Sequence, residues 1–157
     1  MVIEESIRIN ASLERVWDIF TDLTCWKNWC SVLEDVSAEG RRLEEGNSFK
    51  CCIRPFDIPM NLEPYVEEII PMDRIVWSGK KHGISARHEF TFQMNGNEVL
   101  LTSREAFSSP FMSPLRFLFP KSKLQELSGK MLREIKMAAE EGPGTQNNEK
   151  IQHSNKT

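Results

Sequence analysis

Hydrophobic and polar residues alternate along much of this 157-residue chain. Ile3, Ile7 and Ile9 stand among polar neighbours, which predicts a half-buried strand over residues 2–9. From about residue 32, apolar runs recur between short stretches of turn-forming residues. This pattern predicts six further strands, at about 32–39, 46–54, 60–70, 73–81, 84–94 and 97–107.

Helical spacing appears in two parts of the chain. After the first strand, Asn10 or Ser12 is placed to cap a short helix, and Asp22 is placed to cap a second one. Residues 122–140 predict a long amphipathic helix. Its apolar stripe consists of Leu124, Leu127, Met131, Ile135 and Ala138.

The connections between consecutive strands are short, so these strands are expected to pair antiparallel. Such a sheet must cover its apolar face, and the last helix is the only predicted element long enough to do so. We therefore predict an α+β protein in which a curved antiparallel sheet of about seven strands wraps around the C-terminal helix and leaves a cavity. Residues 1–141 are predicted to form one domain, and residues 142–157, which have no periodicity, a disordered tail.

Composition and charge narrow the function classes. The net charge is −3 and no basic run is present, which disfavours nucleic acid as a partner. No apolar run approaches the roughly 20 residues that a membrane-spanning helix needs, and the first ten residues contain no apolar block of signal-peptide length. We expect a cytoplasmic protein without an integral membrane segment, and the oligomeric state stays open.

The cysteines and the motif search predict neither a metal site nor a cofactor. Cys25, Cys30, Cys51 and Cys52 lack the paired spacing of a zinc site and are interpreted as reduced thiols. The chain also contains no phosphate-binding loop and no nucleophile with an adjacent base.

Several longer segments resemble a known superfamily. They are "INASLERVWDIFTDLTCWKNW", "LEEGNSF", "VEEIIPMDRIVWSG", and "HEFTF" followed by "SREAF". Together, over about residues 3–140, the chain resembles the helix-grip fold of the START and Bet v 1-like (SRPBCC) superfamily, in particular its polyketide cyclase/dehydrase-like branch. The resemblance implies a ligand-binding cavity between sheet and long helix, and it brings no shared catalytic motif.

His88 interrupts an apolar strand face. Alternation places it on the same face as Ala86 and Phe90, and it places Glu105 on the inward face of the next strand. If Asn95-Gly96 forms the two central residues of the turn, His88 faces Ser103 and Glu105 lies diagonal to it, at roughly 7 to 8 Å. His88 and Glu105 could be a structural pair, orient a ligand, or transfer a proton as the catalytic residues of an enzyme.

Other inward-facing residues are candidates for lining the cavity, and for each the alternative is ordinary core packing. The predicted ligand-binding residues are Trp26, Trp29, Phe49, Cys51, Ile53, Trp77, Ala86, His88, Phe90, Ser103, Glu105, Leu127 and Met131. The proline-rich residues 108–119 are predicted to form either an apolar mouth of the cavity or a patch that docks another protein.

Three functions are compatible with the sequence. The leading hypothesis is binding of a small hydrophobic or aromatic molecule, such as a lipid, an isoprenoid or a polyketide-like compound. The second is a cyclase or dehydratase that uses His88 and Glu105 in acid-base catalysis. The third is a protein-docking or chaperone-like module.

Overall fold

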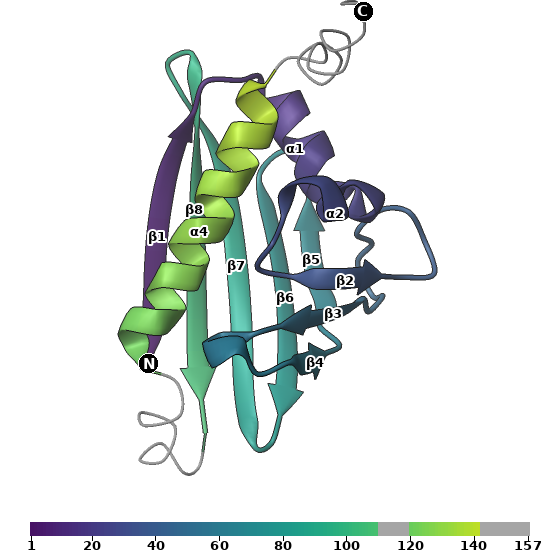
Figure 1. The fold of residues 1–157 in the computed structure, drawn as a ribbon. Helices are drawn as coiled ribbons and strands as arrows, with labels where there is room; N and C mark the ends of the chain where they lie inside the picture. The colour runs from purple at the N-terminus through teal and green to yellow at the C-terminus, as the bar shows by residue number, and fades with distance from the viewer. Residues whose placement is uncertain (110–119, 142–157) are drawn as a thin grey trace, which may run out of the picture.

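Two antiparallel sheets form the framework of the computed structural model, which describes residues 1–109 and 120–141 (Figure 1). The larger sheet has five strands in the order β1-β8-β7-β6-β5, and the smaller has three in the order β2-β3-β4. The strands are β1 (Val2–Ile9), β2 (Glu34–Ser37), β3 (Lys50–Ile53), β4 (Met60–Leu62), β5 (Tyr65–Ile70), β6 (Arg74–Lys81), β7 (Ile84–Asn95) and β8 (Glu98–Ser108).

The helices lie on one face of the five-stranded sheet. Helix α4 (Lys121–Glu140) runs across β1 and β8, while α1 (Leu13–Thr21) and α2 (Trp26–Trp29) lie beside it with the smaller sheet (Figure 1). The short turns η1 (Leu23–Cys25) and η2 (Pro55–Asp57) complete the described elements. The predicted α+β arrangement around a long C-terminal helix is confirmed. Within the described residues the strands number eight in two sheets, instead of about seven in one.

The predicted strand at 60–70 is in fact two strands. Pro64 has no N–H to donate to a ladder, so pairing stops there. Before it, β4 pairs with β3, and after it, β5 pairs with β6. This break separates the smaller sheet from the larger one and lets β3 and β4 cover part of the larger sheet.

The turn between β7 and β8 differs from the prediction. Asn95 pairs with Glu98, so Gly96 and Asn97 are the central residues, and Gly96 adopts a φ of 65°. Glycine takes that conformation without a steric penalty, so it occupies the first central position. The predicted register was therefore wrong: His88 lies opposite Glu105, and Ser103 lies opposite Phe90.

An aromatic core lies beneath α1 and α2. Phe20 packs against Phe90 with ring centroids 4.7 Å apart and against Trp26 at 5.6 Å. Trp77 contacts the same group, 4.8 Å from Phe90 and 5.2 Å from Phe49. All five side chains are buried, and they fix the central strands against the helices.

Helix α4 is held in position by its buried face and by hydrogen bonds at its C-terminal end. Its buried residues are Leu124, Ser128, Met131, Leu132, Ile135 and Ala139, so Ala139 is buried in place of the predicted Ala138. Arg15 of α1 donates from Nε to the carbonyl oxygen of Ala139 at 2.6 Å and from Nη2 to that of Glu141 at 2.6 Å. These carbonyls have no partner within the helix, so Arg15 joins the two helices.

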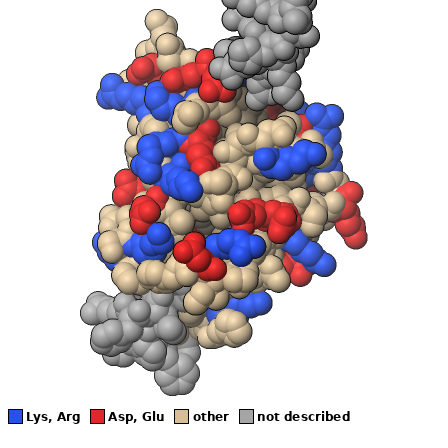
Figure 2. All heavy atoms as spheres, viewed as in Figure 1, with Lys and Arg blue, Asp and Glu red and all other residues tan. Residues whose placement is uncertain are grey.

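The predicted helix caps occur at the expected positions. The Ser12 side chain accepts a hydrogen bond from the backbone N–H of Arg15, and Asp22 accepts one from the backbone N–H of Thr24. Arg41 also binds Asp22, at 2.6 Å, which holds the pKa of that buried carboxyl well below its usual range. Charges of both signs are interspersed over the face shown in Figure 2.

Candidate functional site

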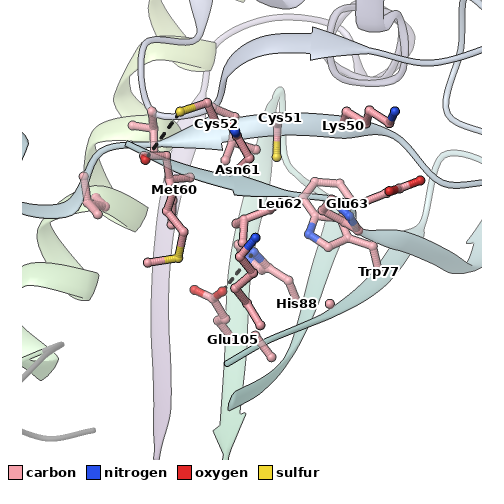
Figure 3. Close-up of a pocket in the computed structure, with 18 of the residues that line it drawn as sticks. Lys50, Cys51, Cys52, Met60, Asn61, Leu62, Glu63, Trp77, His88 and Glu105 are labelled. Carbon is pink, nitrogen blue, oxygen red and sulfur yellow. Dashed lines mark hydrogen bonds and ion pairs between the residues drawn. The ribbon is translucent and has the colours of Figure 1, made fainter. Parts of the chain in front are cut away.

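A pocket of about 920 Å³ lies between the two sheets and α4 (Figure 3). Strands β3 and β4 form one side, β6, β7 and β8 form another, and α4 closes a third. The cavity was predicted between the large sheet and the helix alone, and the smaller sheet supplies an additional wall. Most of the wall is apolar, with Val32, Leu33, Cys51, Cys52, Ile53, Met60, Leu62, Trp77, Ile84, Ala86, Phe107, Leu124, Leu127 and Met131.

Eight of the predicted ligand-binding residues lie in this wall: Cys51, Ile53, Trp77, Ala86, His88, Glu105, Leu127 and Met131. The others do not reach it. Trp26, Phe49 and Phe90 are in the aromatic core behind Trp77. Trp29 is partly buried against the same core. Ser103 is buried beneath the wall, 2% exposed.

His88 and Glu105 face each other from neighbouring strands, as Figure 3 shows. The imidazole Nδ1 is 3.8 Å from the carboxyl Oε1, which is too long for a hydrogen bond. The His88 ring stacks on Phe90, with centroids 4.0 Å apart, and meets Trp77 edge-on at 5.5 Å. The pair is thus held by aromatic packing on one side and is open to the pocket on the other.

Burial makes the charged form of both residues unfavourable. It lowers the pKa of His88 to about 3 and raises the pKa of Glu105 to about 7. The imidazole is therefore neutral at neutral pH, while the carboxyl is divided between its acidic and ionised forms. A group with such a pKa can either accept or donate a proton near pH 7.

Two serines extend this polar cluster. His88 Nε2 is 2.6 Å from Ser103 Oγ, which is 3.0 Å from the Oγ of Ser128 on α4. Ser128 also lies in the pocket wall. The sequence analysis did not select Ser128, although it follows Leu124 by four residues and precedes Met131 by three, a spacing that places it on the same helix face.

Apart from Glu105, the charged residues that line the pocket within residues 1–109 and 120–141 are exposed, except Lys81, which is half-buried. The cations are Lys50, Lys80 and Lys81, with His82 beside them, and the anions are Asp35 and Glu63. Since both positive and negative side chains are present, these charged residues do not by themselves select an anionic or a cationic ligand.

The cysteines are free thiols, and three of them are buried. Burial raises the pKa of Cys51 to about 12 and that of Cys30 to about 11. Because the thiolate is the nucleophile, these thiols are unreactive at neutral pH. Cys51 therefore contributes apolar surface to the pocket. Within the described part of the chain, no three His, Cys, Asp or Glu side chains are grouped to hold a metal ion.

The family model described as "Polyketide cyclase / dehydrase and lipid transport" matches residues 1–140. The chain belongs to this family. The resemblance to the SRPBCC superfamily and the helix-grip fold are thereby confirmed for this polyketide cyclase-like protein. The family points to binding of a small hydrophobic ligand or to polyketide cyclase activity. A comparison with curated proteins gave no match.

Solved structures share the fold at low sequence identity. Hypothetical protein jhp0584 from Helicobacter pylori has a TM-score of 0.74 and 14% identity, with 88% of each chain covered. TTHA0849 from Thermus thermophilus has a TM-score of 0.74 and 15% identity, with 90% of this chain and 100% of that chain covered. The di-domain ARO/CYC BexL from the BE-7585A biosynthetic pathway has a TM-score of 0.75 and 16% identity, and the match covers 91% of this chain and 51% of BexL.

None of the described helices combines the length and the apolar character that crossing a membrane would require. The cytoplasmic location stays a prediction.

Proposed function

We propose that this polyketide cyclase-like protein binds one small, mainly apolar molecule, such as a lipid, an isoprenoid or a polyketide-like compound, in the pocket between the sheets and α4. The observation that carries this proposal is a mainly apolar wall that contains a polar cluster, formed by half-buried His88 and Glu105 and buried Ser128. Ligand pockets typically have volumes of about 300–1,000 Å³ and a few well-placed polar groups. The apolar wall would supply affinity, and the cluster would fix the orientation of the ligand.

The test is native mass spectrometry of the protein purified from its own host, with identification of any molecule that remains bound. We expect a bound small molecule in the wild type and none in the variant Ala86→Phe, whose larger side chain fills part of the pocket. Met94→Phe is the matched control, because Met94 lies on the same strand and is 52% exposed. An equal amount of bound molecule in Ala86→Phe and wild type would exclude this pocket as the site.

Acid-base catalysis is the second candidate, and the pKa of Glu105 favours it. The ionised Glu105 carboxylate would remove a proton from a carbon next to a ketone, and His88 would orient the substrate for this step. The resulting enolate would attack a second carbonyl of the same chain, and the proton would pass from Glu105 to the new alkoxide. A carboxyl with a pKa of about 7 is suited to both halves of this transfer.

This candidate predicts different effects on binding and on turnover. With a linear poly-β-ketone as substrate, His88→Ala should retain binding and lose turnover, and Glu105→Gln should do the same. Ser37→Ala, which changes another hydroxyl of the pocket wall, should retain both. Turnover that survives in His88→Ala excludes a proton-transfer role for that residue.

The docking hypothesis depends on residues 108–119, of which 110–119 lie outside the described residues. It stays a prediction.

A further inference from the structure

We propose that Ser128 recognises a carbonyl oxygen of the bound molecule, and that Ser103 and His88 pass the protonation state of Glu105 on to the Ser128 hydroxyl. This inference rests on the proposed binding function and specifies the ligand as one that carries a carbonyl group. Ser128 would act by direct contact, and Ser103 would be a positioning residue.

The position of Ser128 distinguishes it from its neighbours. It is the polar member among the residues of α4 that line the pocket, the others being Leu124, Leu127 and Met131. Its Oγ lies 3.0 Å from Ser103 Oγ, and Ser103 Oγ lies 2.6 Å from His88 Nε2. Ser128 and His88 both reach the pocket, and Ser103 connects them from beneath the wall.

The number of available protons limits how His88, Ser103 and Ser128 can donate hydrogen bonds to one another. Each serine has one O–H to donate, and a neutral imidazole has one N–H. If His88 carries its proton on Nε2, it donates to Ser103, Ser103 donates to Ser128, and the Ser128 proton is available to the pocket. If the imidazole proton is on Nδ1, the direction reverses: Ser128 donates to Ser103, and only its lone pairs face the pocket.

Glu105 selects between the two arrangements because it faces Nδ1, at 3.8 Å. At this distance no hydrogen bond forms, so Glu105 acts through its charge. A protonated carboxyl attracts no proton to Nδ1, which favours the imidazole proton on Nε2 and the arrangement in which Ser128 donates to the pocket. An ionised carboxylate favours Nδ1–H and the reverse arrangement. A ligand carbonyl can only accept, so it should bind Ser128 better when Glu105 is protonated. Burial places the pKa of Glu105 at about 7 and leaves His88 neutral above pH 5.

Other groups around Glu105 could also titrate, so the test must separate them from it. Ile3 is its partner on β1, and no charged side chain of α4 lines the pocket. The titratable or charged groups that line the same pocket are His88 on β7, Lys80 and Lys81 at the end of β6, His82 in the turn after it, and Asp35, Lys50 and Glu63 on the side of the smaller sheet. Glu5 on β1 lies opposite Ser103 and accepts a hydrogen bond from Gln125 of α4.

The experiment compares 2-acetylnaphthalene with 2-ethylnaphthalene, which has a similar shape but no carbonyl. Dissociation constants are measured by equilibrium dialysis at pH 5.5 and pH 8.5. We expect the wild type to prefer the ketone by about five-fold at pH 5.5, the effect of one neutral hydrogen bond, and by less than two-fold at pH 8.5.

The variants separate the roles. Ser128→Ala should lose the preference at both pH values. Ser103→Ala should keep a preference that no longer depends on pH, because the Ser128 hydroxyl is then free to rotate. Glu105→Gln should also remove the pH dependence. The control Ser122→Ala, which changes an exposed hydroxyl of the same helix outside the pocket wall, should behave like the wild type.

Each alternative outcome overturns a defined statement. If Ser128→Ala prefers the ketone as strongly as the wild type does, Ser128 does not recognise the carbonyl. This result is expected if the Ser128 hydroxyl donates its proton to a backbone carbonyl of the helix instead. A wild-type preference that is equal at both pH values overturns the coupling to Glu105. If both compounds bind equally well, only this inference fails. If neither binds, the proposed binding function fails for aromatic ligands together with the inference.

Discussion

Among single residues, His88 and Glu105 reduce the stability of the fold when either is charged. The folded protein keeps the Glu105 proton up to a pKa of about 7, whereas an unfolded chain releases it near the ordinary value of 4.5. Between these values the folded state binds more protons than the unfolded state, so this residue makes the protein less stable as the pH rises. For His88 the folded state binds fewer protons than the unfolded state between about pH 3 and 6.5, so this residue makes the protein more stable as the pH rises through that range.

Glu105→Gln should therefore become more stable relative to the wild type as the pH rises from 5 to 8. The difference in unfolding free energy should change by an amount on the order of 2–3 kcal/mol, because each pKa unit corresponds to about 1.4 kcal/mol. Urea denaturation at several pH values measures it.

The control for this measurement is Glu39→Gln, which changes an exposed carboxylate of a loop. The unfolding free energy of Glu39→Gln should differ from that of the wild type by the same amount at every pH. A constant difference between Glu105→Gln and the wild type across this range would contradict a raised pKa for Glu105.

Among the structural elements, the turn between β7 and β8 determines which residues meet in the pocket. Gly96 has a φ of 65°, a conformation that costs an L-residue about 1 kcal/mol or more. Gly96→Ala should therefore lower the unfolding free energy by about 1 kcal/mol, measured by urea denaturation.

Gly79 provides the comparison within the same sheet. Its φ is not positive, and a Cβ there would meet no atom within 4 Å. Gly79→Ala should leave the stability unchanged or slightly increased, because alanine restricts the unfolded chain. Equal losses for Gly96→Ala and Gly79→Ala would show that the conformation of the turn is not the cause.

Arg15 connects α1 to the C-terminal end of α4. Arg15→Met keeps the aliphatic stem and removes three hydrogen bonds to helix carbonyls. We expect a loss of about 1–3 kcal/mol in unfolding free energy and faster amide hydrogen exchange in the last turn of α4. Arg133→Met, on the exposed side of α4, should change stability by less than about 0.5 kcal/mol.

For the protein as a whole, the sequence was sufficient for the fold class and for part of the site. The alternation of strands and the apolar stripe of the last helix record which faces are buried, so Cys51, Trp77, Ala86 and His88 could be placed on inward faces. The periodicity of apolar residues shows that a face is buried. It does not show whether that face packs against the core or lines a pocket. For that reason Trp26, Phe49 and Phe90 could not be distinguished from pocket residues.

Two further differences arise from local geometry. The pairing of His88 with Glu105 depends on which two residues occupy the turn centre, and Asn95-Gly96 and Gly96-Asn97 are both suitable pairs. The separate small sheet depends on Pro64, which lies within the single strand predicted at 60–70. The sequence analysis does not select Ser128, because a serine within an apolar stripe is usually a neutral helix position and its partner, Ser103, comes from β8.

The unfilled pocket implies that the molecule is not at its maximum stability. Ala86→Phe should abolish ligand binding and still unfold at a free energy equal to or up to about 1 kcal/mol above that of the wild type, since the added ring buries apolar surface and suits a strand. Thermal and urea denaturation of ligand-free protein measure this. A large loss of stability would mean that the pocket has no room at Ala86, and Met94→Phe again serves as the control.

Trp77 belongs to both the core and the pocket wall: it stacks on Phe20 with ring centroids 6.0 Å apart and makes T-shaped contacts with Phe49 and His88. Its indole is held in a fixed place and is only 5% exposed. A ligand that enters the pocket will displace solvent next to this indole. Of the four tryptophans in the chain, Trp77 is the one that lines the pocket. A change in tryptophan emission when a compound is added can therefore report occupancy without any attached label.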